Sequence, residues 1–172
     1  MRTQNSIALL LAMVLVGTTV AATAAEPPCE VVPVSKGAEK TDRYLKITLP
    51  RNAKVKDLGS PDSFAREITT QDGIVLLDYG LDTLIERRLK KHDARCELTI
   101  NGQRTVMGFF KEGGVTHAEG YVVEATSKEF RGYLRVSPKA ADRLPTLLGV
   151  ASTIKFVGVA KWVEVLDQMR KN

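Results

Sequence analysis

The chain has 172 residues and a formal net charge of +5, and its composition is that of an ordinary globular protein, which excludes wholesale disorder. Its first 25 residues resemble a secretory signal peptide: a positive start at Arg2, an apolar run from Ile7 to Val16, and small residues at Ala22–Ala25. The apolar run is too short for a stable membrane span. We therefore expect an exported protein, secreted or, in a Gram-negative host, periplasmic.

About 147 residues remain after this segment, which is the length of one domain. Arg2 is the only charged residue of residues 1–25, so 24 basic and 20 acidic residues leave a mature net charge of +4. This mild excess aids solubility, and it favours an anionic partner such as a cell-wall polymer, a lipid headgroup or an acidic protein. Nucleic acid is not expected as a partner, because the exported chain has no basic arm.

The chain has two cysteines, Cys29 and Cys96, and both belong to the mature segment. An even number of cysteines in an oxidising compartment predicts a disulfide. That bond would join an N-terminal arm to a strand that starts near Cys96. Lipidation of Cys29 is the rival interpretation, but Glu26-Pro27-Pro28 does not supply the small residues that such a site needs. A metal site is less favoured, since two cysteines so far apart lack ligand spacing.

The polar, proline-containing residues 26–43 predict an extended arm that could include a short strand over Glu30–Val34, followed by a single domain over residues 44–172. Alternating or continuous apolar residues predict the strands of that domain. In chain order they are 44–49, 64–68, 74–77, 96–100, 105–110, 121–125, 130–136 and 153–157. Asn101-Gly102 is a strong hairpin signal. A two-residue turn there would face Met107 and Phe109 inward, and a three-residue loop would face Val106 and Phe110 inward.

Three segments predict helices. Asp82 can cap a helix over residues 83–92, which ends on the basic residues Lys90 and Lys91. Ser137-Pro138 predicts the start of a second helix, which Pro145 must kink or split. A third helix, over residues 159–169, carries Trp162 on an apolar stripe that would pack in the core or, if detached, bind a partner.

Strands joined mainly as hairpins, with two to three helices packed on them, define an α+β fold with a mainly antiparallel sheet. The order of elements resembles the PsbP-like fold family. The resemblance covers residues 44–157 and includes the opening strand Leu45–Pro50, the Ile100-Asn101-Gly102 hairpin and the strand Gly132–Val136. It implies a sandwich-like binding or assembly protein without catalytic chemistry. It assigns no functional residue here.

Arg131, Tyr133 and Arg135 form the most informative surface motif. Alternation along a strand places all three on one side, with Phe130, Gly132, Leu134 and Val136 on the other. Two guanidinium groups around an aromatic ring suit carboxylates, phosphates or sugar acids. The simpler interpretation is a solvated sheet face, or a covered Tyr133 with arginines that reach water.

No group of residues in the sequence predicts catalysis or a cofactor. The two histidines, His92 and His117, are expected to be exposed, the first at the end of a helix and the second in a turn. A metal site would need both histidines with a carboxylate such as Asp93 or Glu119. Asp78, Asp82 and Glu86 could form a carboxylate cluster, but turn and cap chemistry explains them better.

The expected function is therefore non-catalytic binding of a protein or an anionic envelope component, as an accessory factor. One alternative is a periplasmic immunity or inhibitor protein that neutralises a toxin or hydrolase. Another is an unrecognised enzyme that acts on envelope material through acidic residues near Asp78. The partner and the oligomeric state stay open.

Overall fold

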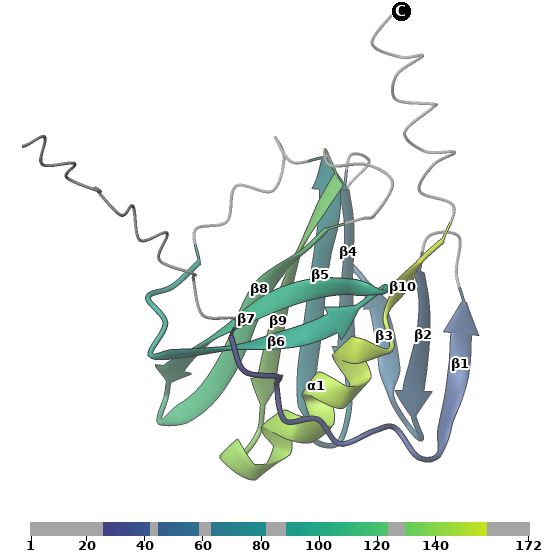
Figure 1. The fold of residues 1–172 in the computed structure, drawn as a ribbon. Helices are drawn as coiled ribbons and strands as arrows, with labels where there is room; N and C mark the ends of the chain where they lie inside the picture. The colour runs from purple at the N-terminus through teal and green to yellow at the C-terminus, as the bar shows by residue number, and fades with distance from the viewer. Residues whose placement is uncertain (1–25, 42–44, 59–62, 82–88, 124–129, 158–172) are drawn as a thin grey trace, which may run out of the picture.

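The computed structural model describes residues 26–41, 45–58, 63–81, 89–123 and 130–157. In these segments the chain forms a three-stranded and a seven-stranded antiparallel sheet with one α-helix between them (Figure 1). The strands are β1 (Gly37–Thr41), β2 (Leu45–Pro50), β3 (Lys54–Asp57), β4 (Ser63–Thr69), β5 (Gly73–Leu81), β6 (Ala94–Ile100), β7 (Gln103–Glu112), β8 (Val115–Val123), β9 (Phe130–Pro138) and β10 (Lys155–Phe156). The helix is α1 (Leu144–Ser152), and a 3-10 turn, η2 (Ala141–Arg143), precedes it.

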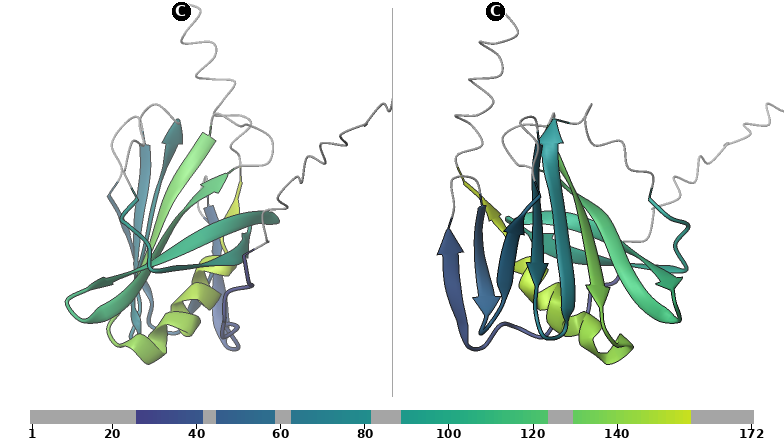
Figure 2. Two further views of the ribbon diagram at one scale, coloured as in Figure 1. Left: turned by 60° about the vertical axis from the view of Figure 1, so that its left-hand side comes forward. Right: turned by 180° about the vertical axis from the view of Figure 1, so that it is seen from behind.

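The strand order is β3-β4-β5-β9-β8-β7-β6 in the large sheet and β1-β2-β10 in the small one. The large sheet bends strongly, so that β6 and β7 run across the direction of β4 and β5 (Figures 1 and 2). Helix α1 lies inside this bend, where it contacts β5, β6, β8, β9 and β2. We call the side of the large sheet that faces α1 the inner face, and the opposite side the outer face.

Alternation along the strands fills the inner face, as the sequence predicts. Gly132, Leu134 and Val136 of β9 are all buried, and Leu45, Ile47 and Leu49 of β2 close the core from the small sheet. Asn101 and Gly102 form the two-residue turn, both with positive φ (52° and 73°), as such a hairpin requires. Of the two predicted registers the first is therefore correct, and Met107 is fully buried on the inner face.

The number of helices was predicted incorrectly for the part of the chain that the structure describes, which contains one α-helix instead of two to three. Residues 89–92 have no helical structure, and residues 82–88 and 159–169 lie outside the described segments. The helix expected after Ser137 begins only at Leu144, because β9 continues to Pro138. Pro145 lies in the first turn of α1, where its missing N–H is tolerated, and so it does not kink the helix.

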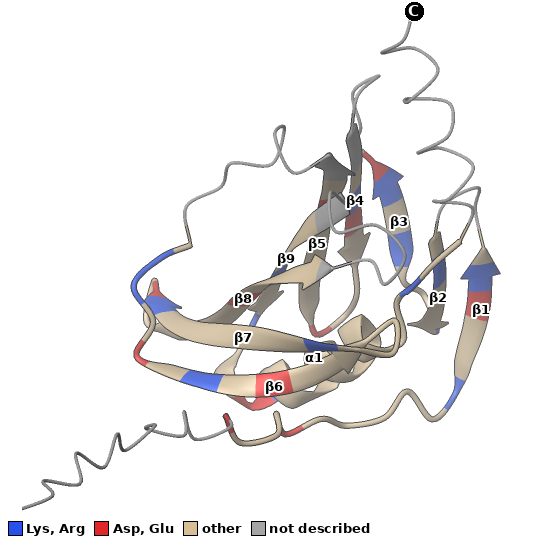
Figure 3. Ribbon diagram, turned by 45° about the horizontal axis from the view of Figure 1, so that its top comes forward, with Lys and Arg blue, Asp and Glu red and all other residues tan. Residues whose placement is uncertain are grey.

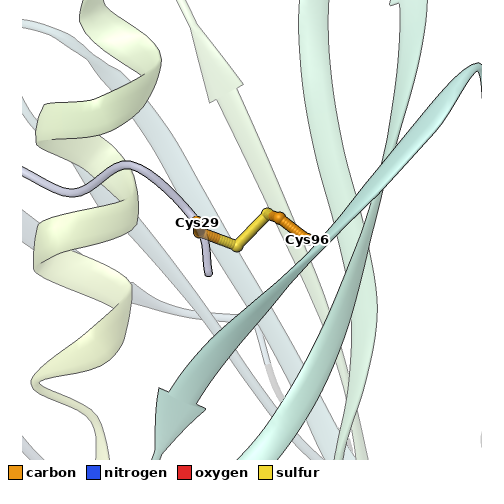
Figure 4. Close-up of a disulfide and its surroundings, with 2 residues drawn as sticks. All are labelled: Cys29 and Cys96. Carbon is orange, nitrogen blue, oxygen red and sulfur yellow. A yellow bond between two sulfur atoms is a disulfide. The ribbon is translucent and has the colours of Figure 1, made fainter. Parts of the chain in front are cut away.

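The N-terminal residues 27–34, which we call the strap, pass over the side of α1 that the large sheet does not cover. Cys29 N–H donates to Glu97 O at 2.8 Å and Glu97 N–H donates to Pro27 O at 2.7 Å, so the strap starts on the edge of β6. Val32 N–H then donates to Pro145 O of the helix at 3.0 Å. The Cys29–Cys96 disulfide confirms the predicted bond and ties the strap to β6, with a Cα–Cα distance of 4.9 Å (Figure 4).

Five consecutive residues of α1, Leu147 to Ala151, are buried. A helix that packs on one sheet buries only one stripe, so burial of every side requires a cover on the far side. The strap supplies it. A methyl group added at Gly149 would lie 1.9 Å from Val32 O.

The Gly149→Ala variant tests this close approach. Alanine is normally more stable than glycine in a helix interior by about 1 kcal/mol, but here its methyl group must displace the strap. We therefore expect a lower free energy of unfolding, measured with urea. Thr146→Ala in the same helix is the control and should leave stability nearly unchanged. Stabilisation by Gly149→Ala would show that the strap does not press on the helix.

The disulfide should contribute strongly to stability, because it closes a long loop, with a sequence separation of 67 residues. Loop-closure entropy predicts a loss of about 4 kcal/mol in the Cys29→Ser/Cys96→Ser double variant. Urea unfolding of the oxidised protein and the double variant measures this difference. Thiol titration of the oxidised, denatured protein should find no free cysteine, and two reactive thiols would contradict the bond.

Candidate functional site

The strap, helix α1 and the ends of β6–β8 border an open pocket of about 430 Å³, which we call the strap pocket. Its residues are Pro27, Pro28, Cys29, Glu30, Arg95, Cys96, Phe109, Thr116, Ala141, Leu144, Pro145 and Leu148. The volume falls within the range of about 300–1,000 Å³ that small-molecule sites occupy. The position follows from the fold, since the pocket lies where the strap leaves β6 and passes to the helix.

Most of the pocket wall is apolar. Phe109 comes from the inner face of β7, Leu144 and Leu148 come from the first turns of α1, and the disulfide with its two preceding prolines forms the strap side. Proline rings and a cystine have few rotatable bonds, so this wall is stiff. A stiff apolar wall is suited to holding an apolar group without ordering many side chains on binding.

Two charged residues, Glu30 and Arg95, belong to the same pocket, and both are exposed. Neither forms an ion pair or a side-chain hydrogen bond with another described residue. Other charged groups nearby are paired: Glu97 of the same strand bonds to Arg104 Nε at 2.8 Å. Arg95 is the register partner of Gly108, against which His92 packs on the outer face, so the Arg95 side chain starts on the outer face, opposite Cys96 and Phe109. The strap pocket is therefore defined mainly by its apolar walls.

The outer face of the large sheet contains a second polar site, formed by Lys90, His92, Glu112, Glu119, Tyr133 and Arg135, which we call the outer-face cluster. Glu119 of β8 is only 2% exposed. Its carboxylate accepts hydrogen bonds from Tyr133 Oη at 2.7 Å, from His92 Nε2 at 3.1 Å and from the backbone N–H of Lys90. The buried charge therefore has three partners, as such a group requires.

The outer-face cluster holds residues 89–93 against the sheet. A methyl group at Gly108 would lie 2.1 Å from His92 Nδ1, so the imidazole rests directly on the backbone of β7. Asp93 N–H donates to Phe109 O at 2.8 Å. The ammonium of Lys90 lies 2.8 Å from Glu112 Oε1 and 4.7 Å from the centre of the Phe110 ring. These contacts give the cluster a structural role.

The two carboxylates of the outer-face cluster have lowered pKa values. Burial works to raise the pKa of Glu119, but hydrogen bonds from Tyr133, the Lys90 backbone and His92 outweigh it, and the pKa lies below its usual range. Hydrogen bonds from Lys90 and Arg135 likewise lower the pKa of Glu112. Both groups are anions at neutral pH.

Two residues of the predicted binding motif Arg131, Tyr133 and Arg135 bond to other side chains of the protein. Tyr133 is on the outer face as predicted, but it is only 5% exposed and bonds to Glu119. Arg135 is partly exposed, pairs with Glu112 and donates to Ser137 Oγ at 3.2 Å. The side chain of Arg131 is not among those that the structure describes. Binding of an anion by this motif stays a prediction, and Arg135 would have to leave Glu112 to take part in it.

The predicted exposure of His92 is wrong, since its side chain is 8% exposed and paired with Glu119. His117 lies in β8 instead of a turn, is half-buried and stacks on Phe110 at 5.3 Å. No group of three or more His, Cys, Asp and Glu residues in the described segments could hold a metal ion. Asp78 lies on β5 opposite Tyr133. Asp82 and Glu86 are outside the described residues, so the carboxylate cluster is not tested.

Sequence reasoning missed the strap pocket and the central position of Glu119. The pocket combines residues from three distant segments, and no local pattern unites them. Glu119 had a weak signal in the neighbouring strand: a glycine inside a strand, here Gly108, often marks the close approach of another group. That group is His92, which reaches Glu119 from the same side.

Comparison with protein-family models, curated proteins and solved structures finds no match. The resemblance to the PsbP-like fold family thus stays a prediction. Within the described residues, no helix is long and apolar enough to cross a membrane.

The Glu119→Gln variant tests the outer-face cluster. It keeps the shape of the side chain but loses the charge that His92 and the Lys90 N–H bind, so we expect a loss of about 1.5–3 kcal/mol at pH 7. The lowered pKa gives the sign of the pH dependence: the carboxylate stabilises the fold above the unfolded-state pKa of about 4.3, and this contribution disappears as the pH falls through the folded-state value.

Urea unfolding at pH 7 and in the acidic range measures both effects. The difference between wild type and Glu119→Gln should shrink as the pH falls. Glu39→Gln is the matched control, because Glu39 forms an exposed pair with Lys46 and exposed pairs contribute little. A difference that grows on acidification would contradict the assignment of Glu119 as a stabilising anion.

Proposed function

We propose that this protein is an exported, non-catalytic binding protein of the cell envelope and that it holds the apolar part of its ligand in the strap pocket. The observation that carries the proposal is the pocket itself: about 430 Å³, with largely apolar walls and a disulfide that holds one side in place. Concave apolar sites with a few polar groups are the usual form of small-molecule sites.

The residue types in the pocket support binding more than catalysis. Among the residues that line it, the ionisable groups are the carboxylate of Glu30 and the guanidinium of Arg95, and both cysteines are in the disulfide. General acid–base catalysis near neutral pH needs groups whose pKa lies near the working pH, of which histidine is the commonest. The polar groups of the outer-face cluster bond to one another and hold residues 89–93, so they too favour a structural role.

The net charge of the mature chain supports an anionic partner. The mature chain has an excess of positive charge, which favours anions at long range. Guanidinium groups recognise carboxylates and phosphates, and Arg95 is an exposed arginine of β6 that no described residue pairs with.

Binding of the uncharged dye Nile red tests the pocket, because its fluorescence rises in an apolar site. We expect saturable binding of one dye per protein. Ala141→Trp places a large ring at the pocket, so it should abolish this signal. Ala140→Trp is the matched control, since Ala140 is an exposed neighbour that does not line the pocket.

Both tryptophan variants should keep the melting temperature of the wild type, because both positions are exposed. Equal dye binding by the Ala141→Trp and Ala140→Trp variants would place the apolar site elsewhere. The absence of saturable binding to the wild type would refute the proposed function.

A further inference from the structure

The positive charge of the chain is concentrated in residues 36–57, which we call the basic segment. It holds 7 of the 25 basic and 3 of the 20 acidic residues, so its net charge is +4, whereas the other 150 residues together carry +1. The basic segment forms β1, β2 and β3, which lie side by side at one side of the molecule (Figures 1 and 3). The charge excess of the chain therefore has a definite place in the fold.

Most cations of the basic segment are free of ion pairs, although its described carboxylates are not. Glu39 pairs with Lys46 at 2.8 Å, and Asp57 pairs with Arg66 of β4 at 2.5 Å. Five other basic residues are exposed and form no ion pair with a described residue: Lys36, Lys40, Arg51, Lys54 and Lys56. The fold thus neutralises the anions of this segment and leaves these cations available.

The free cations follow one another around the end of the small sheet. The β1–β2 ladder ends at the pair Gly37–Pro50, and Lys36 and Arg51 directly adjoin this pair, one on each strand. Arg51 begins the turn that leads to Lys54 at the start of β3. The register therefore brings cations from both ends of the basic segment to one place.

We propose that the basic segment binds a flexible, linear polyanion of the cell envelope, a polymer with repeated phosphate or carboxylate groups. The inference shares the exported location of the proposed function, but it goes beyond the strap pocket and does not depend on it. An exposed ion pair contributes little by itself. A surface of separate lysine and arginine side chains therefore suits a partner that contacts several of them at once.

The directions of the lysines favour a flexible polymer over a membrane surface. Lys40 is the register partner of the buried Ile47, so its side chain starts on the core side of the small sheet. Lys54 and Lys56 flank Val55, which packs against the core, so they face the outer side of the large sheet. A flat surface could reach only some of these lysines, whereas a flexible chain can pass from one to the next.

The absence of exposed apolar side chains points the same way. Among the described residues of the basic segment, no large hydrophobic side chain is exposed. Peripheral binding to a membrane generally combines positive charge with apolar side chains that enter the interface. The basic segment offers charge alone, which is sufficient for a polyanion in water.

Fluorescence anisotropy with two end-labelled polymers tests the inference on the mature protein. Inorganic polyphosphate is the probe for repeated phosphates, and polygalacturonate is the probe for repeated carboxylates. We expect saturable binding of at least one polymer, and the one that binds more tightly identifies the preferred anionic group. The affinity should fall as the salt concentration rises, since salt screens exposed charges.

The Lys40→Gln/Lys54→Gln/Lys56→Gln variant removes three of the free cations. We expect it to bind the polymer about tenfold more weakly, which is a loss of about 1.4 kcal/mol and within what three exposed ion pairs contribute. Its melting temperature should equal that of the wild type, because all three side chains are exposed.

The Lys91→Gln/Lys111→Gln/Lys139→Gln variant is the matched control. These three lysines are also exposed, and they lie outside the basic segment. Both triple variants have the same net charge, so a difference between them reports the position of the charges and not their total. The control should bind the polymer almost as tightly as the wild type.

Three results would overturn the inference: no binding of either polymer to the wild type, equal weakening in both triple variants, or tighter binding to phosphatidylglycerol vesicles than to either polymer. Equal weakening would mean long-range attraction without a site, and preference for vesicles would mean a membrane partner. Nile red binding, measured on the same proteins, should be unchanged in both variants. Its absence in the wild type would refute the strap pocket alone, so the two proposals fail separately.

Discussion

Burial of the middle of helix α1 on every side is the constraint on which the rest of the structure depends. Leu147 to Ala151 are buried one after another. The helix therefore cannot bury one apolar stripe against a sheet and leave its opposite side in water, as an amphipathic helix does. The bent sheet covers one side and the strap covers the other, and Gly149 brings the two backbones together. Without the strap this apolar helix would face water. The disulfide thus does more than close a loop, since it holds in place the second wall of the core.

The strap pocket is a consequence of how the strap meets the sheet. A chain segment beside an edge strand normally continues as a further strand, but Pro27 and Pro28 lack the N–H that a ladder needs. Only one bridge forms, between Pro28 and Glu97. The strap then turns away from β6 towards Pro145, and the space between strap, strand and helix becomes the pocket. The disulfide lies at this branch point (Figure 4).

The two edges of the large sheet are protected in different ways. The strap bonds to Glu97 near the middle of β6, and Asn101 N–H donates to Ile154 O just beyond its end. At the other edge, β3 carries Lys54, Lys56 and Asp57, and charged side chains oppose the pairing of edge strands between molecules (Figure 3). The exposed strand β1 in the small sheet is charged in the same way. These charges explain why neither β1 nor β3 has the apolar alternation that predicts a strand.

Local patterns predicted the elements whose residues alternate between core and solvent, and they failed where distant segments decide the structure. The inner residues of β2 and β9, the Asn101-Gly102 turn and the disulfide follow from period, turn chemistry and compartment. His92 does not, because its burial depends on the absence of a side chain at Gly108 and on the carboxylate of Glu119. Alternation placed Tyr133 on the outer face correctly, but it could not show that this part of the outer face is covered.

The outer-face cluster shows why most charged side chains of the large sheet are not available to a ligand. Glu119 and Arg135 are direct partners in the β8–β9 register, yet Arg135 pairs with Glu112 while Glu119 binds Tyr133 and His92. Each charge there is matched within the fold, which stabilises it and leaves little for a ligand. Arg95, in register with Gly108 across the β6–β7 pair, has no such partner among the described residues. Its side chain starts on the outer face, so it is the apolar walls and the disulfide that make the strap pocket the better candidate for binding.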